Sequence, residues 1–301
     1  MGLRNVARSL VLKAVSGARL NELALSLSKR KADSSRIVVV EMHETLSAHA
    51  DQLRRQLDWV AEHFTFIDPE SFAHAWEKKV RTWPGSKPAV LFTFDDGREC
   101  NYRVAAPLLE SFGTRGIFFV VPQFIGRSAI NKDARDFYYS KIDIRKRTPA
   151  AVQQDAQQDE IWKPMTPEQL ADLARRGHWI GNHTLSHVAL AGLSAPELHR
   201  EIDESCEQIA SWTGKPVSAF AWPYSWDAID RDSWALVKES HRFCFAPCPG
   251  IADLVRDSQH LIWRKEIESY YHSSEYRFMY SGLVDPIWAA RRKKLRKMLC
   301  H

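Results

Sequence analysis

The stretch Ala89-Val90-Leu91-Phe92-Thr93-Phe94-Asp95-Asp96-Gly97 passes directly from apolar and β-branched residues to two adjacent carboxylates and a glycine. An uninterrupted apolar run is typical of a strand that is buried on both faces, as in parallel sheets covered by helices. Acidic residues that end such a strand lie at the mouth of its sheet, where α/β folds hold their ligands. The stretch therefore predicts an α/β fold with two carboxylates at one end of a buried sheet.

A second motif, His183-Thr184-Leu185-Ser186-His187, carries two imidazoles four residues apart. This spacing allows both rings to point to one side of a helical turn. One carboxylate and two imidazoles form a mixed oxygen and nitrogen ligand set that suits zinc or a similar divalent ion. Three protein ligands leave one position open for water, which is typical of catalytic sites, and the second carboxylate is then free to act as a base. The two motifs together indicate a metal-dependent hydrolase.

Together, T-F-D-D-G and H-T-x-S-H resemble the motifs of the polysaccharide deacetylase family, the carbohydrate esterases with the NodB homology domain. The resemblance extends from about Ile37 to about Ile267 and includes Ala106-Pro107-Leu108-Leu109, Gly116-Ile117-Phe118-Phe119-Val120, Met165-Thr166-Pro167-Glu168-Gln169-Leu170 and Phe220-Ala221-Trp222-Pro223-Tyr224-Ser225. It implies a distorted (β/α) barrel of about seven parallel strands. It also implies removal of the N-acetyl group from an acetamido sugar, with release of acetate.

The resemblance also implies roles for the acidic and imidazole side chains. Asp96, His183 and His187 would hold the divalent metal ion, for which we expect Zn²⁺, although cobalt, nickel and manganese accept the same ligands. Asp95 would remain off the metal, take a proton from water and direct the attack of that water on the carbonyl group.

Two further residues follow from the same resemblance. The backbone N–H of Tyr224 would stabilise the oxyanion, with Trp222 beside it at the substrate; the alternative is an aromatic turn that packs on the core. Many family members place an arginine in this motif as the partner of the base, but Ala221 and Trp222 stand there in this chain. Arg264 is the replacement that we expect, and the alternative for it is a surface salt bridge.

Expulsion of an amine requires a general acid, and histidine suits that task near pH 7. Many family members supply it from a late L-x-H motif, which is not found in the expected region of this chain. One branch of the family instead carries a histidine after its first strand, where this chain has His43 directly after Val38-Val39-Val40-Glu41-Met42. We therefore expect His43 to be the acid; the alternatives are a core histidine or a hydrogen-bond donor to the substrate.

The pattern of apolar residues predicts alternating strands and helices between an N-terminal segment and a basic C-terminal tail. We expect an amphipathic helical segment at 1–34, a catalytic domain at 35–270 with a polar insertion at 129–163, and the tail at 271–301. Within the insertion, Tyr138, Tyr139 and Trp162 could stack on sugar rings or pin the insertion to the core. Strands are predicted at 37–42, 64–67, 89–95, 116–121, 178–182, 217–221, 242–246 and 261–267, and helices at 50–63, 69–81, 102–112, 167–176, 195–212 and 226–239.

The charge distribution limits the classes of binding partner that we expect. The formal net charge is +5, and the run Arg291-Arg292-Lys293-Lys294-Leu295-Arg296-Lys297 is concentrated near the C-terminus. The run is either a solvated helix end or a basic patch for anionic lipid, and we expect no nucleic-acid partner because the remainder is near charge balance. Lys13 interrupts the first apolar stretch, so no signal-peptide core and no transmembrane segment are predicted, and we expect a cytoplasmic protein that could lie at the inner face of the membrane.

The leading functional prediction is therefore metal-dependent N-deacetylation of a glycan or glycoconjugate, with a lipid-linked intermediate as one candidate substrate. One alternative retains the site and changes the substrate to an O-acetyl group or a non-sugar amide. The other alternative is a carbohydrate-binding pseudoenzyme. That alternative requires a broken set of catalytic residues, whereas Asp95, Asp96, His183 and His187 are all present.

Overall fold

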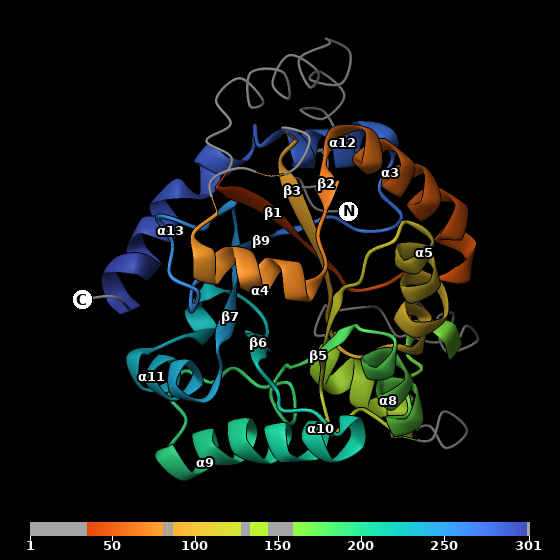
Figure 1. Cartoon of the computed structure of the whole chain (residues 1–301). Helices are drawn as coiled ribbons and strands as arrows, with labels where there is room; N and C mark the ends of the chain where they lie inside the picture. Colours follow the sequence, from red (N-terminus) through yellow and green to blue (C-terminus); the bar gives the residue numbers. More distant parts are fainter. Residues whose placement is uncertain (1–34, 81–82, 84–86, 128–132, 144–158, 300–301) are drawn as a thin grey trace, which may run out of the picture.

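The computed structural model describes residues 35–80, 83, 87–127, 133–143 and 159–299 of the 301-residue chain. The predicted N-terminal segment at 1–34 and most of the polar insertion therefore lie outside the described residues. Seven parallel strands close into a barrel, because β1 pairs with β3 on one side and with β9 on the other (Figure 1). Around the barrel they are β1 (Arg36–Met42), β3 (Ala89–Phe94), β4 (Ile117–Val120), β5 (Trp179–Asn182), β6 (Ala219–Ala221), β7 (Phe243–Pro249) and β9 (Ile262–Glu266). This arrangement confirms the predicted (β/α) barrel.

Two short strands extend the sheet beyond the barrel. The strand β2 (Thr65–Phe66) pairs in parallel with the first residues of β3, and β8 (Ala252–Asp253) pairs antiparallel with the first residues of β1. The sequence pattern predicts β2 but not β8, since two residues are too short to show a period-2 pattern.

Side chains alternate between the inside and the outside of the barrel along every strand. The inward residues Ile37, Leu91, Phe119 and Phe245 form one hydrophobic cluster, and their neighbours pack outward against helices. Gly181 on β5 leaves room for Phe119, because a Cβ atom at this position would collide with the phenyl ring. The barrel is therefore a packed core and not a channel.

The N-terminal mouth of the barrel is closed by helix α4 (Pro69–Lys78), which lies across it in Figure 1. The Phe72 ring on α4 lies 5.2 Å from the ring of Phe243 and 5.8 Å from that of Phe245, measured between centroids. Trp76 on the next turn of α4 is 1% exposed and belongs to the same cluster. An aromatic plug therefore seals this end of the barrel.

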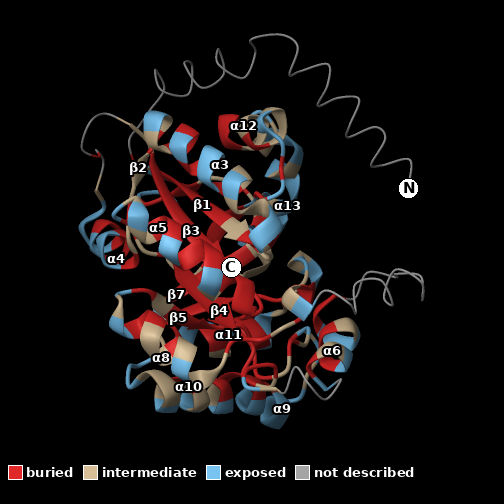
Figure 2. Cartoon of the chain, turned by 90° about the vertical axis from the view of Figure 1, so that its right-hand side faces the viewer, coloured by how far each residue is buried: buried red, intermediate tan, exposed pale blue. Residues whose placement is uncertain are grey.

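The remaining helices cover the outside of the barrel with their apolar faces turned inward, as the burial colouring in Figure 2 shows. Helix α8 (Pro167–Arg175) begins with a capping box, in which Thr166 and Gln169 exchange side-chain and backbone hydrogen bonds. Helix α9 (Ala195–His199) continues through a π-helical stretch at Arg200–Glu204 into α10 (Ser205–Thr213). The outer helices are α3 (Ala50–His63), α5 (Ala106–Ser111), α8 (Pro167–Arg175), α9 (Ala195–His199), α10 (Ser205–Thr213) and α11 (Arg231–Ser240).

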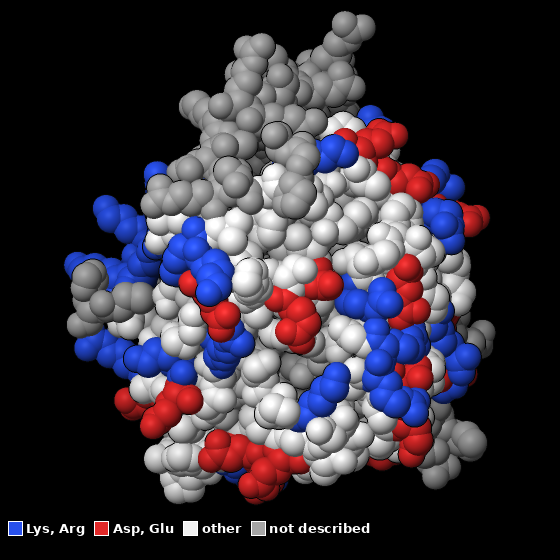
Figure 3. Space-filling view, viewed as in Figure 1, with Lys and Arg blue, Asp and Glu red and all other residues white. Residues whose placement is uncertain are grey.

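In the part of the predicted basic tail that is described, 271–299, the helices are α12 (Ser273–Ser281) and α13 (Asp285–Leu299). Leu295 on α13 is fully buried in the cluster that covers β7 and α11, and Arg296 forms an ion pair with Asp257. Figure 3 shows Lys and Arg side chains gathered along α13, where Ile287 is 73% exposed. The helix is therefore anchored by one face and presents a basic face to solvent. No helix in the described ranges is long and apolar enough to span a bilayer.

Candidate active site

Polar side chains replace apolar ones in the last inward-facing layer of the barrel, at the carboxyl ends of the strands. Glu41 on β1, Asp95 after β3, His183 after β5 and Arg264 on β9 enter this layer from four different strands. Each of these residues continues the series of inward-facing positions of its own strand, which recur at every second residue. Leu91, Thr93 and Asp95 illustrate this series along β3 and just beyond it. The fold therefore brings together residues that are far apart in the sequence.

Asp96, His183 and His187 form a buried group whose ligand atoms face one another. The Nε2 atoms of His183 and His187 lie 3.8 and 3.6 Å from Oδ1 of Asp96. Each Nδ1 donates to a backbone carbonyl, at 2.8 Å to Ala221 and at 2.7 Å to Lys141, which leaves the Nε2 lone pair for a ligand. Burial lowers the pKa of both imidazoles to about 4, so that they are neutral and able to bind metal. The donor set fits a divalent transition metal ion.

The two histidines lie on a loop after β5 and not on the predicted helical turn. Thr184 and His187 have φ angles of 64° and 56°, in the left-handed region that no regular helix uses. The buried carboxylate of Glu201 holds this loop, since it accepts hydrogen bonds from the N–H and the Oγ–H of Ser186 at 2.9 and 2.8 Å. The four-residue spacing thus predicted the proximity of the rings correctly but not the backbone that produces it.

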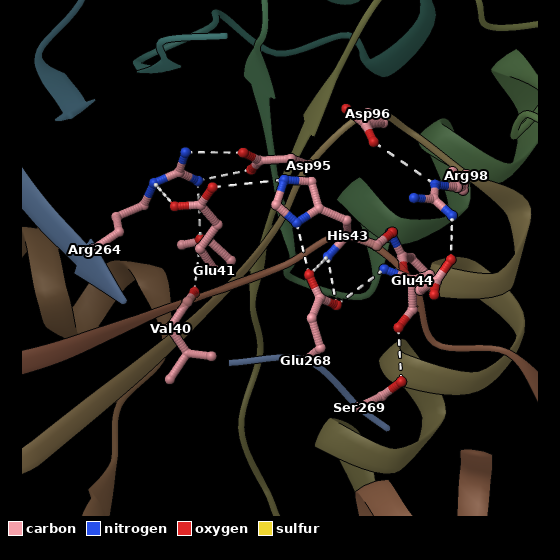
Figure 4. Close-up of polar contacts among 12 residues, drawn as sticks. Val40, Glu41, His43, Glu44, Asp95, Asp96, Arg98, Arg264, Glu268 and Ser269 are labelled. Atoms are coloured by element: carbon pink, nitrogen blue, oxygen red, sulfur yellow. Dashed lines mark hydrogen bonds and ion pairs between the residues drawn. The ribbon is translucent and has the colours of Figure 1, made fainter. Parts of the chain in front are cut away.

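Asp95 is held by a bidentate ion pair with Arg264, with nitrogen–oxygen distances of 2.7 and 2.8 Å (Figure 4). Arg264 is 1% exposed, so the surface salt bridge considered from the sequence does not describe it. Burial by itself would raise the pKa of Asp95, but the guanidinium group lowers it to about 2. Asp95 therefore remains ionised throughout the physiological range.

His43 lies directly after β1 and points into the same region (Figure 4). Its Nδ1 is 2.7 Å from Oε1 of Glu268, and its Nε2 is 3.6 Å from Oε1 of Glu41. Burial would lower the pKa of His43, but the hydrogen bond and the charge of Glu268 raise it well above its usual value. The imidazole is therefore protonated at neutral pH and can give up a proton.

Tyr224 and Trp222, which are close in sequence, lie in different environments. Tyr224 has a φ of 62°, and its ring lies 4.7 Å from that of His187. Its hydroxyl oxygen lies 2.7 Å from the carbonyl oxygens of both Lys141 and His187, which share its one proton. Trp222 is 1% exposed and packs beside Phe220 in the outer core. The predicted position of Trp222 at the substrate is wrong, because the inward positions of β6 are Ala219 and Ala221.

A cavity of about 220 Å³ opens beside the Asp96 group. The residues that line it include His43, Asp96, Glu266 and Tyr270. Its volume is below the roughly 300–1,000 Å³ of sites for drug-sized ligands.

The insertion supplies part of the cavity wall and is pinned to the core. Tyr138 lines the cavity from a π-helical turn at Tyr138–Ile142 and is fully buried, and Trp162 is 5% exposed in the same small cluster as Phe124. Of the two alternatives for these aromatics, burial favours pinning for Trp162. Tyr138 is compatible with both alternatives, because it is packed and also lines the cavity. The carbonyl of Lys141, in the same turn, accepts the hydrogen bond from Nδ1 of His187.

Three residues of this region were not predicted from the motifs, namely Glu41, Arg98 and Glu268. Arg98 follows the T-F-D-D-G motif, pairs with Glu44 at 3.0 Å and lies 3.7 Å from Asp96. Glu41 could have been found by alternation, since it lies two residues before His43 on an inward-facing position. No signal identifies Glu268, which lies beyond the end of β9.

Comparisons with known proteins agree with this architecture. The family model described as polysaccharide deacetylase matches residues 83–241. The Bacillus subtilis (strain 168) protein YxkH, which carries the name of that family, is 26% identical over 120 residues, which are 40% of this chain and 31% of YxkH. The match thus spans about a third of the length of this curated relative.

Three solved structures share the fold. The deacetylase PplD of Streptococcus pyogenes, in complex with acetate, has a TM-score of 0.60 at 17% identity, and the match covers 82% of this chain and 97% of the PplD chain. IcaB from Ammonifex degensii has the same TM-score and identity, and the match covers 82% of this chain and 96% of the IcaB chain. The BpsB deacetylase domain from Bordetella bronchiseptica has a TM-score of 0.59 at 19% identity and covers 79% and 97%. With the family model matching more than half of its length, the chain belongs to the polysaccharide deacetylase family.

Proposed function

We propose that this protein is a metal-dependent hydrolase that removes the N-acetyl group from an acetamido sugar in a glycan or glycoconjugate. One observation carries the proposal. A buried group of one carboxylate and two imidazoles that could hold a metal ion, an ionised carboxylate and a protonated imidazole lie at the same part of the barrel mouth, beside a cavity of about 220 Å³.

Asp96, His183 and His187 are the residues that would hold the metal ion. When bound, a divalent ion such as Zn²⁺ lowers the pKa of water and polarises a carbonyl group. The protein contributes neutral imidazoles in fixed tautomers and a carboxylate whose second oxygen faces Arg98. Buried ligands in a fixed orientation avoid reorganisation during the reaction.

Asp95 is the proposed general base. Arg264 holds both of its oxygens and keeps it ionised, so that it can accept a proton from the attacking water. Its neighbour Asp96 binds the metal ion, and that cation removes the repulsion that two adjacent carboxylates would otherwise have. The attack converts the acetamido carbon to a tetrahedral centre whose oxygen carries negative charge, for which the backbone N–H of Tyr224 is the proposed donor.

His43 is the proposed general acid. When the carbon–nitrogen bond breaks, the leaving nitrogen takes the electron pair and needs a proton, which the imidazolium supplies. The hydrogen bond from Nδ1 to Glu268 fixes the ring, so that Nε2 faces the reacting region. Glu268 is therefore a positioning residue for the acid.

For the substrate, we propose a lipid-linked acetamido sugar at an anionic membrane surface, at the inner face of the membrane. The exposed face of α13 supports this proposal, since it carries Ile287 together with the exposed cations Lys293 and Lys297. Apolar and cationic side chains on one helix face favour binding to anionic lipid. Co-sedimentation with phosphatidylglycerol vesicles tests the contact, and equal sedimentation of wild type and an Ile287→Asp, Lys293→Glu, Lys297→Glu variant would contradict it.

Acetate release by the purified protein tests the reaction. The substrates are N-acetylglucosamine oligomers and a lipid-linked acetamido sugar, with an O-acetylated sugar beside them to test the alternative ester substrate. We expect release that stops after chelation, returns with Zn²⁺ and is lost in Asp95→Asn. Acetate from the ester alone would replace amide hydrolysis by O-deacetylation. Binding of glycan without any release would instead support a carbohydrate-binding pseudoenzyme.

A further inference from the structure

Glu41 is a largely buried carboxyl group that has no role in the reaction described so far. It lies on β1 two residues before His43, on the inward-facing side of the strand, and its side chain is 17% exposed. Figure 4 shows its carboxyl group between the guanidinium group of Arg264 and the imidazole of His43. It therefore joins the partner of the proposed base to the proposed acid.

The two oxygens of Glu41 face these two neighbours. Oε2 is 3.3 Å from Nε of Arg264, and Oε1 is 3.6 Å from Nε2 of His43. The other nitrogen of the imidazole is occupied by Glu268. Nε2 is thus the atom available for proton delivery, and Glu41 is the carboxyl group adjacent to it.

The charges around Glu41 allow it to bind and release a proton. Arg264 already satisfies both oxygens of Asp95, so one guanidinium group is shared by two carboxyl groups. The charged groups that act on Glu41 are Arg264 and Glu266 from β9, Asp95 after β3, and His43. Burial raises the pKa of Glu41 to about 7 despite the opposing effect of Arg264.

We propose that Glu41 is the proton donor that reloads His43 after each turnover, an inference that rests on the proposed deacetylase function. The preceding step breaks the carbon–nitrogen bond, and the amine nitrogen takes its proton from Nε2 of His43. Glu41 then transfers its carboxyl proton to Nε2, and Nε of Arg264 stabilises the carboxylate that remains. Solvent water at the exposed 17% of the Glu41 side chain returns a proton to Glu41. Asp95 releases to solvent the proton that it took from the attacking water, and the cycle is then complete. Glu41 acts through His43 and is a positioning residue in the sense that it does not touch the substrate.

The substitution Glu41→Gln separates this role from a structural one. Glutamine retains an oxygen that can accept from Arg264 but has no carboxyl proton to transfer. With enzyme in excess, each molecule turns over once and uses the proton that His43 already carries. We expect a single-turnover rate within about threefold of wild type and a steady-state kcat at least about tenfold lower, with KM unchanged. Imidazole buffer at constant pH should restore the steady-state rate of the variant and leave that of wild type unaltered.

Two further variants make the result decisive. Glu62→Gln is the matched control, because Glu62 lies on α3 with its side chain 73% exposed, and it should behave as wild type in both regimes. Glu41→Asp keeps a carboxyl group in the barrel and should give an intermediate steady-state rate. Equal losses in both regimes for Glu41→Gln, or no loss in either, would overturn the relay. Absence of acetate from wild type in the single-turnover regime would overturn the deacetylase function itself, and the relay with it.

Discussion

The two mouths of the barrel are built from the same seven strands and differ in almost every physical property. At the N-terminal mouth, α4 packs Phe72 and Trp76 onto the aromatic ends of the strands, in one buried hydrophobic cluster with Phe243. At the C-terminal mouth, Asp95, Glu41 and Arg264 occupy the corresponding inward positions. One end therefore contributes stability through burial of apolar surface, whereas the other holds charges whose burial is costly. Changes at the two ends should separate stability from activity.

The largest effect is expected for Asp95→Asn at the polar mouth. Loss of the base should lower kcat by up to about 10⁴-fold, since an amide cannot accept the proton. Glu41 remains 3.3 Å from Arg264, so the guanidinium group keeps one partner and the variant should fold. Acetate release, zinc content and thermal unfolding would be measured together. Zinc binding lost along with activity would mean that Asp95, not Asp96 alone, holds the metal.

Next comes Phe72→Ala at the plugged mouth. The cavity left between α4 and β7 should lower the free energy of unfolding by about 3–5 kcal/mol, which is roughly 10³-fold in the unfolding equilibrium. The activity of each folded molecule should not change, because the reacting groups lie at the opposite end. Urea unfolding measures the free energy of unfolding, and kcat per active site measures the activity of the folded molecules. If kcat fell by the same factor as the unfolding equilibrium changes, the two ends of the barrel would be coupled.

A smaller effect on activity is expected for His43→Asn. The loss of the acid should cost about 10²–10³-fold in kcat while zinc content stays at the wild-type level. The pKa of His43 is raised, and the acid acts only when protonated, so wild-type activity should fall as the pH rises through this elevated pKa. In the variant that alkaline limb should disappear from the pH profile. Persistence of the limb would assign it to a different group, and loss of zinc would make His43 a ligand.

The smallest effect is expected away from both mouths, for Thr166→Ala. Thr166 accepts from the N–H of Gln169 and begins α8 on the outside of the barrel. Removal of this cap should cost about 1 kcal/mol of stability and leave kcat unchanged. Thermal unfolding beside acetate release measures both. A change in kcat would mean that the outer helices set the geometry of the polar mouth.

Much of the barrel could be predicted because its strands are short apolar runs with clear ends. Helix α3 begins and ends at the predicted residues, and Asp95 and Asp96 lie at the end of β3 as expected. Asp95 and Asp96 are placed by strand periodicity, which is a local property of the sequence. Arg264 was expected as the partner of Asp95 only from the resemblance to the family, with a surface salt bridge as the alternative, and the structure pairs the two residues.

Other features depend on contacts that a single strand does not encode. Trp222 was misplaced because the face of β6 that turns inward is decided by the closure of the barrel, and that closure favours the small residues Ala219 and Ala221. The loop of His183 and His187 takes its shape from a carboxylate on a different element, Glu201. Glu268 meets His43 across 225 residues of sequence, so no spacing rule could reveal it.

The aromatic plug at the N-terminal mouth affects how a substrate enters the barrel and how products leave it. Because α4 closes the N-terminal end among the described residues, a molecule that reacts at the C-terminal end enters and leaves on that side of the barrel. In the proposed reaction, the cleaved two-carbon fragment would depart by the route along which the glycan arrived, past whatever sugar still occupies it. The order in which the two products leave is then dictated by the architecture of the barrel, and accumulated acetate competes with the next incoming chain for the same opening.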